Sequence, residues 1–157
     1  MFSSQTQEGY PINIQSSLQN YKIVKLLNHG STSIVVLVED QITRKKYSAK
    51  IISKININNC DLLDSINKEI NVLKSISHPN IIKIYDSFEI KSEKSDEEFI
   101  VIIMEYCEKG DLLSYLKSIG FKNDKIKKKI IIDFLKAIQY LHHKGISHGD
   151  IKAENIL

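Results

Sequence analysis

Three side chains near the end of the chain have the types needed for phosphoryl transfer. The segment I-S-H-G-D-I-K-A-E-N-I-L follows a helix-like pattern that Gly145 stops, and it contains Asp150, Lys152 and Asn155. A carboxylate can accept a proton, an ammonium group can meet a phosphate, and an amide oxygen can hold a divalent cation. These groups converge only if the backbone loops. Together they favour phosphoryl transfer, in which catalysis is mostly positioning and charge neutralisation. The structural alternative is a polar turn after a helix, because Gly and Asp are common in turns.

The composition is that of an ordinary globular protein with one core. The chain has 157 residues, of which 26% are charged and 42% hydrophobic, and its net charge is +3. The densest basic run, residues 125–129, contains no aromatic side chain, so it is typical of a solvated helix face. We therefore predict that nucleic acid is not a partner.

Cysteine usage and hydrophobicity favour an intracellular protein. Cys60 and Cys107 are isolated, so neither a zinc site nor a disulfide framework is indicated. The polar N-terminus lacks the apolar core of a signal peptide. The longest apolar run, residues 99–104, is much too short to span a bilayer. We expect a cytoplasmic or nuclear protein with no membrane partner.

Hydrophobic periodicity predicts strands first and helices later. Residues 1–20 have weak periodicity and are expected to form a flexible leader. The segments rich in β-branched or alternating residues predict five strands, at 21–27, 34–38, 46–53, 81–88 and 99–104. Helical patterns cover 59–76, 111–117 and 123–144. This order predicts an α+β fold in two parts, 21–104 and 105–157.

Two charged residues break their local patterns. Glu69 falls among Ile66, Ile70 and Leu73 at helical spacing, and Lys50 lies in the middle of a predicted strand. An unpaired buried charge is strongly unfavourable, so we predict an ion pair between Lys50 and Glu69. The alternative is that either side chain reaches solvent, which is common for lysine.

The segment H-G-D-I-K-A-E-N resembles the H-R-D-L-K-x-x-N catalytic loop of eukaryotic protein kinases. Tyr47-Ser48-Ala49-Lys50 resembles the strand motif that carries the ATP-positioning lysine, and Glu69 matches its helix glutamate. The resemblance starts near Tyr21 and implies a protein-kinase-like fold: an antiparallel five-stranded small lobe with one helix, followed by the first helices of the large lobe. It also implies ATP and Mg²⁺ as cofactors.

The resemblance assigns nucleotide-binding residues one by one. The three glycines of the phosphate-covering loop correspond to Asn28, Gly30 and Ser33, so only one glycine is kept. The remaining implied contacts are a valine packing on the base, a gatekeeper, two hinge residues facing adenine through their backbones and an acid near the ribose: Val35, Met104, Glu105, Cys107 and Asp111.

The resemblance also assigns catalytic roles. Asp150 would orient the substrate hydroxyl and accept its proton, Lys152 would neutralise the γ-phosphate, and Asn155 would bind magnesium. His148 is expected to be structural, and Gly149 replaces an arginine that normally receives an activation-loop phosphate.

The implied activity is transfer of the ATP γ-phosphate to a serine or threonine hydroxyl of a protein, loosely as in the calcium/calmodulin-dependent and AMP-activated group. The alternative is a pseudokinase-like module that binds nucleotide or partners without catalysis. The sequence contains no Asp-Phe-Gly magnesium motif after Asn155, so we expect this chain alone to be marginally stable and catalytically weak or inactive.

Overall fold

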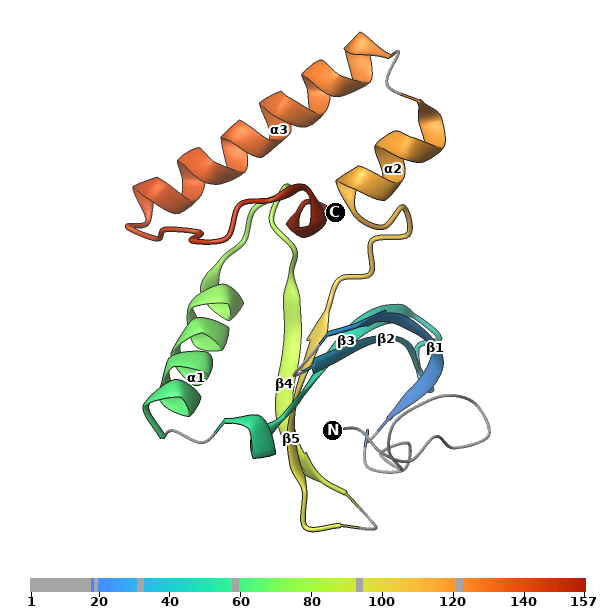
Figure 1. Cartoon of the computed structure of the whole chain (residues 1–157), viewed down its shortest axis with the longest axis vertical. Helices are drawn as coiled ribbons and strands as arrows, with labels where there is room; N and C mark the ends of the chain where they lie inside the picture. The colour runs from blue at the N-terminus through green and yellow to red at the C-terminus, as the bar shows by residue number, and fades with distance from the viewer. Residues whose placement is uncertain (1–17, 19, 31–32, 58–59, 93–94, 121–122) are drawn as a thin grey trace. The chain divides into compact units, whose positions relative to one another are not determined.

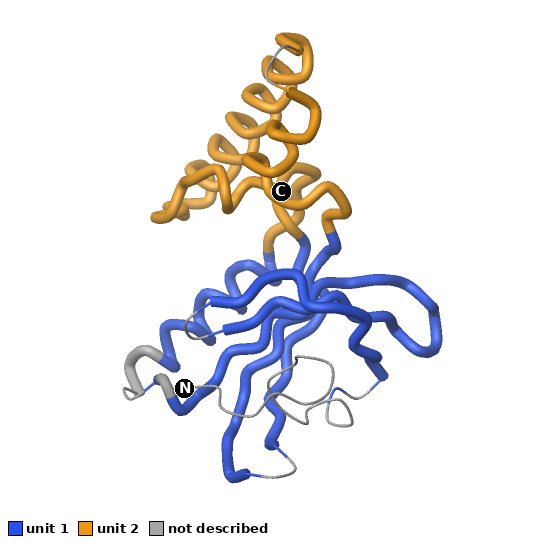
Figure 2. The backbone as a smooth tube through the Cα atoms, turned by 45° about the vertical axis from the view of Figure 1, so that its right-hand side comes forward, with its two compact units in different colours: residues 1–75, 83–106 blue, residues 76–82, 107–157 orange. Residues whose placement is uncertain are grey.

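A computed structural model of the chain describes residues 18, 20–30, 33–57, 60–92, 95–120 and 123–157. The chain divides into two compact units (Figure 2). The first comprises residues 1–75 and 83–106, and the second comprises residues 76–82 and 107–157. Each unit is described by itself below.

The first unit is an antiparallel five-stranded sheet with one long helix, α1 (Figure 1). The strand order is β1-β2-β3-β5-β4, so β5 inserts between β3 and β4. The elements are β1 Tyr21–His29, β2 Ser33–Asp40, β3 Lys46–Ser53, the 3₁₀ helix η1 Lys54–Asn56, α1 Cys60–Ser75, β4 Ile84–Lys91 and β5 Glu98–Met104. This architecture confirms the predicted α+β class and the five-stranded sheet with one helix.

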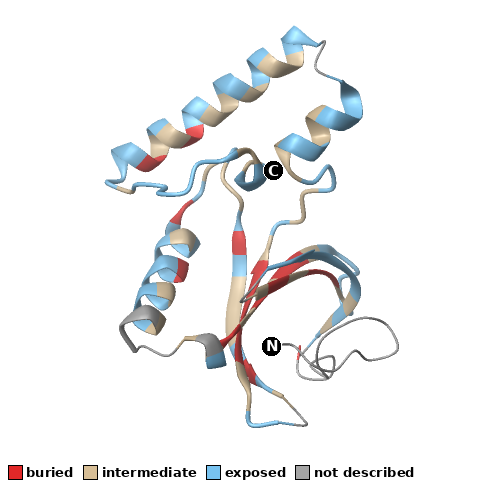
Figure 3. Cartoon of the chain, in the orientation of Figure 1, coloured by how far each residue is buried: buried red, intermediate tan, exposed pale blue. Residues whose placement is uncertain are grey.

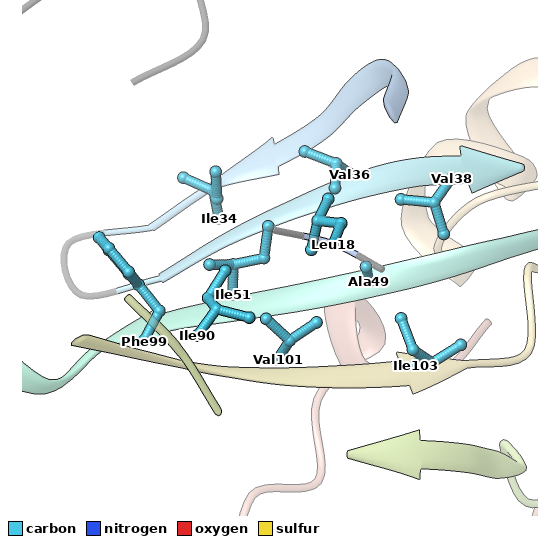
Figure 4. Packing of buried hydrophobic residues seen from close by; sticks show 10 residues of the cluster. All are labelled: Leu18, Ile34, Val36, Val38, Ala49, Ile51, Ile90, Phe99, Val101 and Ile103. Carbon is cyan, nitrogen blue, oxygen red and sulfur yellow. The ribbon is translucent and has the colours of Figure 1, made fainter. Parts of the chain in front are cut away.

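Each face of the sheet has its own hydrophobic cluster, because side chains alternate along a strand. In β5, Phe99, Val101 and Ile103 belong to one cluster, drawn in Figure 4, whereas Ile100 and Ile102 belong to the other. The second cluster includes Ile70 and other apolar residues of α1, so this helix covers that face of the sheet. The buried residues of this unit are concentrated on the central strands (Figure 3).

Leu18 corrects the prediction of a flexible leader over residues 1–20. Its side chain is completely buried in the cluster of Figure 4, and its carbonyl accepts a 3.0 Å hydrogen bond from the Tyr21 amide. The carbonyl of Asn20 accepts a further bond from Gln41 at 2.8 Å. Leu18 and Asn20 are therefore part of the folded unit, and the rest of the predicted leader lies outside the described residues.

The fourth strand begins at Ile84, three residues after the predicted start at Ile81. The Ile81 amide instead donates to the carbonyl of His78 at 3.1 Å, closing a turn around Pro79. Ile81 is therefore part of a hydrogen-bonded turn, although its apolar pattern alone predicted a strand.

The second unit contains α2 Leu112–Ile119, α3 Asp124–His143 and the 3₁₀ helix η2 Ala153–Asn155. Asn123 caps the start of α3 by accepting from the Ile126 amide at 3.2 Å, and Gly145 follows its end with a φ of +70°. Ala137 and Leu141 are the buried residues of this helix. No helix in the described part of the chain has the length and apolar character needed to cross a membrane.

Candidate functional site

The three polar residues of the terminal loop converge on one carboxylate. Lys152 Nζ lies 2.9 Å from Asp150 Oδ2, and Asn155 Nδ2 donates to the same oxygen at 2.8 Å. Asn155 Nδ2 also donates to the Asp150 backbone carbonyl at 2.8 Å. The turn of η2 makes this possible, since the Asn155 backbone amide donates to the Lys152 carbonyl at 3.0 Å and the chain folds back. The loop required by the spacing of these residues is present.

Backbone contacts within the second unit hold this loop. The Leu112 amide, at the start of α2, donates to the Ile156 carbonyl at 2.7 Å. Gly149 adopts a φ of +74°, a left-handed backbone conformation that residues other than glycine rarely adopt. His148 Nδ1 accepts from the Asp150 amide at 3.3 Å, which agrees with the structural role expected for this histidine.

The charges in the loop stabilise each other. The hydrogen bond from Lys152, followed by the bond from Asn155, holds the pKa of Asp150 below its ordinary value. The bond to Asp150 in turn raises the pKa of Lys152. Asp150 is therefore a carboxylate, and Lys152 a cation, at neutral pH. Both side chains are more than half exposed, so they are accessible to a substrate.

The donor atoms of this loop fit a magnesium ion. Since Asn155 uses its nitrogen to bond Asp150, its side-chain oxygen remains available as a hard ligand. Among the described residues, no three His, Cys, Asp or Glu side chains gather as a preformed metal cage. Mg²⁺ normally takes few protein ligands and keeps water or phosphate oxygens for the rest, so the Asn155 amide oxygen can serve as one of its ligands.

In the first unit, predicted nucleotide-binding residues share one face of the sheet. Lys50 lies between Val35 of β2 and Ile102 of β5, its directly paired neighbours. Met104 is paired with Ser48, two residues before Lys50 and therefore on the same face. Val35, Lys50 and Met104 are thus brought to one surface, on the side of the sheet that α1 covers.

The predicted ion pair between Lys50 and Glu69 is not formed. Glu69 is exposed on α1, and in the described part of the chain no ion pair within 4.0 Å joins it to Lys50. The residues that pack against the sheet are Leu63, Ile66, Ile70 and Leu73. Glu69 lies at the flank of this stripe, where its carboxylate reaches water, so the expected burial of this charge was wrong.

In the turn between β1 and β2, the described backbone amides donate to acceptors within the same hairpin. Gly30 donates to the Ser33 carbonyl at 2.8 Å, and His29 donates to Asn28 Oδ1 at 2.7 Å. A Cβ at Gly30 would lie 3.3 Å from the Ser33 carbonyl oxygen, so a glycine fits this close approach. Asn28 belongs to β1, paired with Val35, and does not have the positive φ considered for a phosphate loop. Residues 31 and 32 lie outside the described part.

The segment after β5 contains a contact that the sequence analysis missed. The Glu105 amide donates to the Lys83 carbonyl at 2.9 Å, and the Glu105 carbonyl accepts from Ser48 Oγ at 2.9 Å. Ser48 is 6% exposed. A polar residue between apolar neighbours in a central strand was the available signal, because buried hydroxyls require partners.

Asp111 and Cys107, two further predicted residues, lie in the second unit. Asp111 caps α2: its Oδ1 accepts from the Ser114 amide at 2.9 Å and its Oδ2 from the Ser114 hydroxyl at 2.7 Å. The Ser114 hydroxyl, followed by the Ser114 amide, lowers the pKa of Asp111. The Cys107 carbonyl accepts from the Gly110 amide at 3.2 Å. The structure thus shows a helix-capping role for Asp111, and its predicted ribose contact stays a prediction.

Comparison with known proteins identifies the family. Residues 21–157 match the protein kinase domain. The chain is 32% identical over 139 residues to human (Homo sapiens) 3-phosphoinositide-dependent protein kinase 1, covering 88% of this chain and 24% of that protein. It is 37% identical over 158 residues to calcium-dependent protein kinase 6 of Plasmodium berghei, covering 100% of this chain and 10% of that protein. It is 36% identical over 152 residues to serine/threonine-protein kinase cds1 of Schizosaccharomyces pombe, covering 92% and 31%.

The chain therefore belongs to the eukaryotic protein kinase family. The match to the domain begins at Tyr21, the first residue of β1, and includes both the sheet and the Asp150 loop. The chain spans about a quarter to a third of the length of the first curated relatives it matches.

Proposed function

We propose that this chain carries the nucleotide-binding sheet and the catalytic loop of an ATP- and Mg²⁺-dependent serine/threonine protein kinase. Its substrate is a protein, and the transferred group is the γ-phosphate of ATP. The names of its relatives, which include a serine/threonine-protein kinase, support this substrate class. A cytoplasmic or nuclear location, without nucleic-acid or membrane partners, is part of the same proposal.

The observation that carries the proposal is the convergence of Lys152 and Asn155 on Asp150, at 2.9 and 2.8 Å. Asp150 Oδ2 holds both neighbours, which leaves Oδ1 to orient a substrate hydroxyl and take its proton. The lysine ammonium group places a positive charge beside that position, where it would offset the charge of the transferred phosphate. A lysine two residues after the aspartate, as here, resembles serine/threonine kinases rather than tyrosine kinases.

The sheet face of the first unit supports nucleotide binding. Val35 and Met104 supply apolar contact for a base, and Lys50, paired with Val35 and Ile102, supplies a positive charge beside them. Asn155 would hold Mg²⁺ through its side-chain oxygen, and the ion would neutralise phosphate charge. Each of these assignments pairs a residue's chemistry with its position in the structure.

A pseudokinase-like binding module is the second candidate, and two observations favour it. Glu69 is exposed and separate from Lys50, so the lysine lacks the partner that would orient it toward phosphates. The amides of His29 and Gly30 are used inside their own hairpin. Both features weaken phosphate positioning, whereas the Asp150 cluster favours catalysis.

Transfer of labelled γ-phosphate from ATP to a protein rich in serine, threonine and tyrosine separates the two candidates. Asp150→Asn should reduce transfer at least about 100-fold, the usual contribution of a general base. Asp133→Asn is the matched control, because Asp133 forms surface ion pairs with Lys129 and Lys136 on α3. The control should transfer phosphate like the wild type, to serine and threonine.

Transfer that survives Asp150→Asn would contradict the catalytic role of this residue. Binding of ATP without any transfer by the wild type would favour the pseudokinase-like module.

A further inference from the structure

Ser48 is a buried polar residue in the middle of β3. Its side chain is 6% exposed, and its hydroxyl donates to the carbonyl of Glu105, 57 residues later in the chain, at 2.9 Å. Ser48 is directly paired with Met104, so its hydroxyl bonds the first carbonyl after β5 ends. The hydroxyl is thus fixed at the point where the sheet continues into the next segment.

This hydroxyl lies on the same face of the sheet as Lys50. Side chains two residues apart in a strand point to the same side, so Ser48 and Lys50 share a surface, and Val35 is the direct neighbour of Lys50 on β2. All of these residues belong to the first unit. Val35, Ser48 and Lys50 therefore share this face, and the Ser48 hydroxyl is bonded to the Glu105 carbonyl directly after β5.

We propose that Ser48 is a specificity-determining residue that lets this face accept a purine nucleotide with an oxygen at position 6 as well as ATP. The proposal rests on the proposed nucleotide binding. A bare carbonyl is only an acceptor, so it favours the 6-amino group of adenine and repels a 6-oxo group. A serine hydroxyl has one donor and two acceptor sites and rotates, so it serves either purine.

The hydrogen-bond balance differs between the two nucleotides. With a 6-amino purine, the Glu105 carbonyl has two lone pairs and accepts from both the amine and Ser48 Oγ. With a 6-oxo purine, the Ser48 hydroxyl turns its proton from the carbonyl to the purine oxygen. Removing the hydroxyl leaves the 6-oxo group without a donor but leaves the amine with its acceptor. Removing the hydroxyl therefore lowers the affinity for the 6-oxo nucleotide more than the affinity for the 6-amino nucleotide.

Calorimetric titration of the 157-residue chain with ATP and with inosine triphosphate tests this proposal. Inosine triphosphate carries an oxygen at position 6 and a hydrogen on N1. For each variant we compare the ratio of its affinities for inosine triphosphate and ATP. The effect of the N1 hydrogen is the same in every variant, so it cancels when these ratios are compared. Ser48→Ala should weaken inosine triphosphate relative to ATP by about 3- to 10-fold, the range that one neutral hydrogen bond provides. Ser48→Cys, which keeps the size but donates weakly, should change the ratio in the same direction.

Ser53→Ala is the matched control. Ser53 is on the same strand, is 1% exposed and donates to Glu97 Oε1 at 2.6 Å, but its side chain points to the opposite face. It should leave the affinity ratio unchanged, and circular dichroism should show that all variants remain folded.

An unchanged ratio in Ser48→Ala, or an equal change in Ser53→Ala, overturns the proposal while leaving ATP binding intact. If the wild type binds neither nucleotide, the proposed nucleotide binding fails, and this inference fails with it.

Discussion

Replacing Leu18 by alanine should destabilise the first unit strongly, although Leu18 precedes the residues that match the kinase domain. The side chain has no exposed surface and is packed in the cluster of Figure 4. Burying a leucine completely contributes about 1.5–3 kcal/mol. The cavity left by its truncation adds to this loss, so Leu18→Ala should lower the free energy of unfolding by about 2–5 kcal/mol. Even the lower value increases the unfolded fraction about 30-fold.

Urea unfolding of the 157-residue chain, followed by circular dichroism, measures this change. Leu27→Ala is the matched control, because Leu27 lies on β1 and is 37% exposed. Its loss should be about 1 kcal/mol or less. Equal losses in the two variants, or a loss below about 1 kcal/mol for Leu18→Ala, would refute the conclusion that Leu18 is a core residue.

Three further predictions concern the second unit. Lys152→Met should raise the pKa of Asp150, because the hydrogen bond from Lys152 is the main cause of the lowered pKa. NMR of the Asp150 carboxyl carbon measures the shift. An unchanged pKa would refute the ion pair. Gly149→Ala should lower the free energy of unfolding by about 1–2 kcal/mol through backbone strain alone, since φ is +74° and an added Cβ would meet no atom within 4 Å. An unchanged free energy in urea unfolding would contradict the left-handed conformation. The depressed pKa of Asp111 means that its stabilisation is present above the pKa of the unfolded chain and is lost as pH falls through the lower folded value. Asp111→Asn keeps a capping oxygen that does not titrate, so it should lose less stability on acidification than the wild type, and equal losses would contradict the capping role.

Local patterns predicted the elements whose ends are marked by specific residues. The third strand, Lys46–Ser53, has the predicted bounds, since the polar residues 40–45 mark a turn directly before it. Helix α3 was predicted within a residue at each end: Gly145 marked its end, and the structure shows that Asn123 caps its start. The meeting of Asp150 with Asn155 followed from the need for a loop at that spacing.

Long-range packing decided the features that were missed. Leu18 is a single apolar residue among polar ones, so no periodicity marks its burial. Glu69 is at the flank of the α1 stripe, and only the rotation of the helix against the sheet determines that it reaches water. The bond between Ser48 and Glu105 joins residues 57 positions apart, which no local pattern predicts.

The affinity for ATP, measured with and without Mg²⁺, tests the proposed function most directly. The wild-type chain should bind ATP more tightly when Mg²⁺ is present. Asn155→Ala should remove this dependence but keep the affinity measured without the metal, because it deletes the proposed metal-binding oxygen and leaves the sheet face unchanged. Absence of ATP binding, or a magnesium dependence that survives Asn155→Ala, would contradict the account.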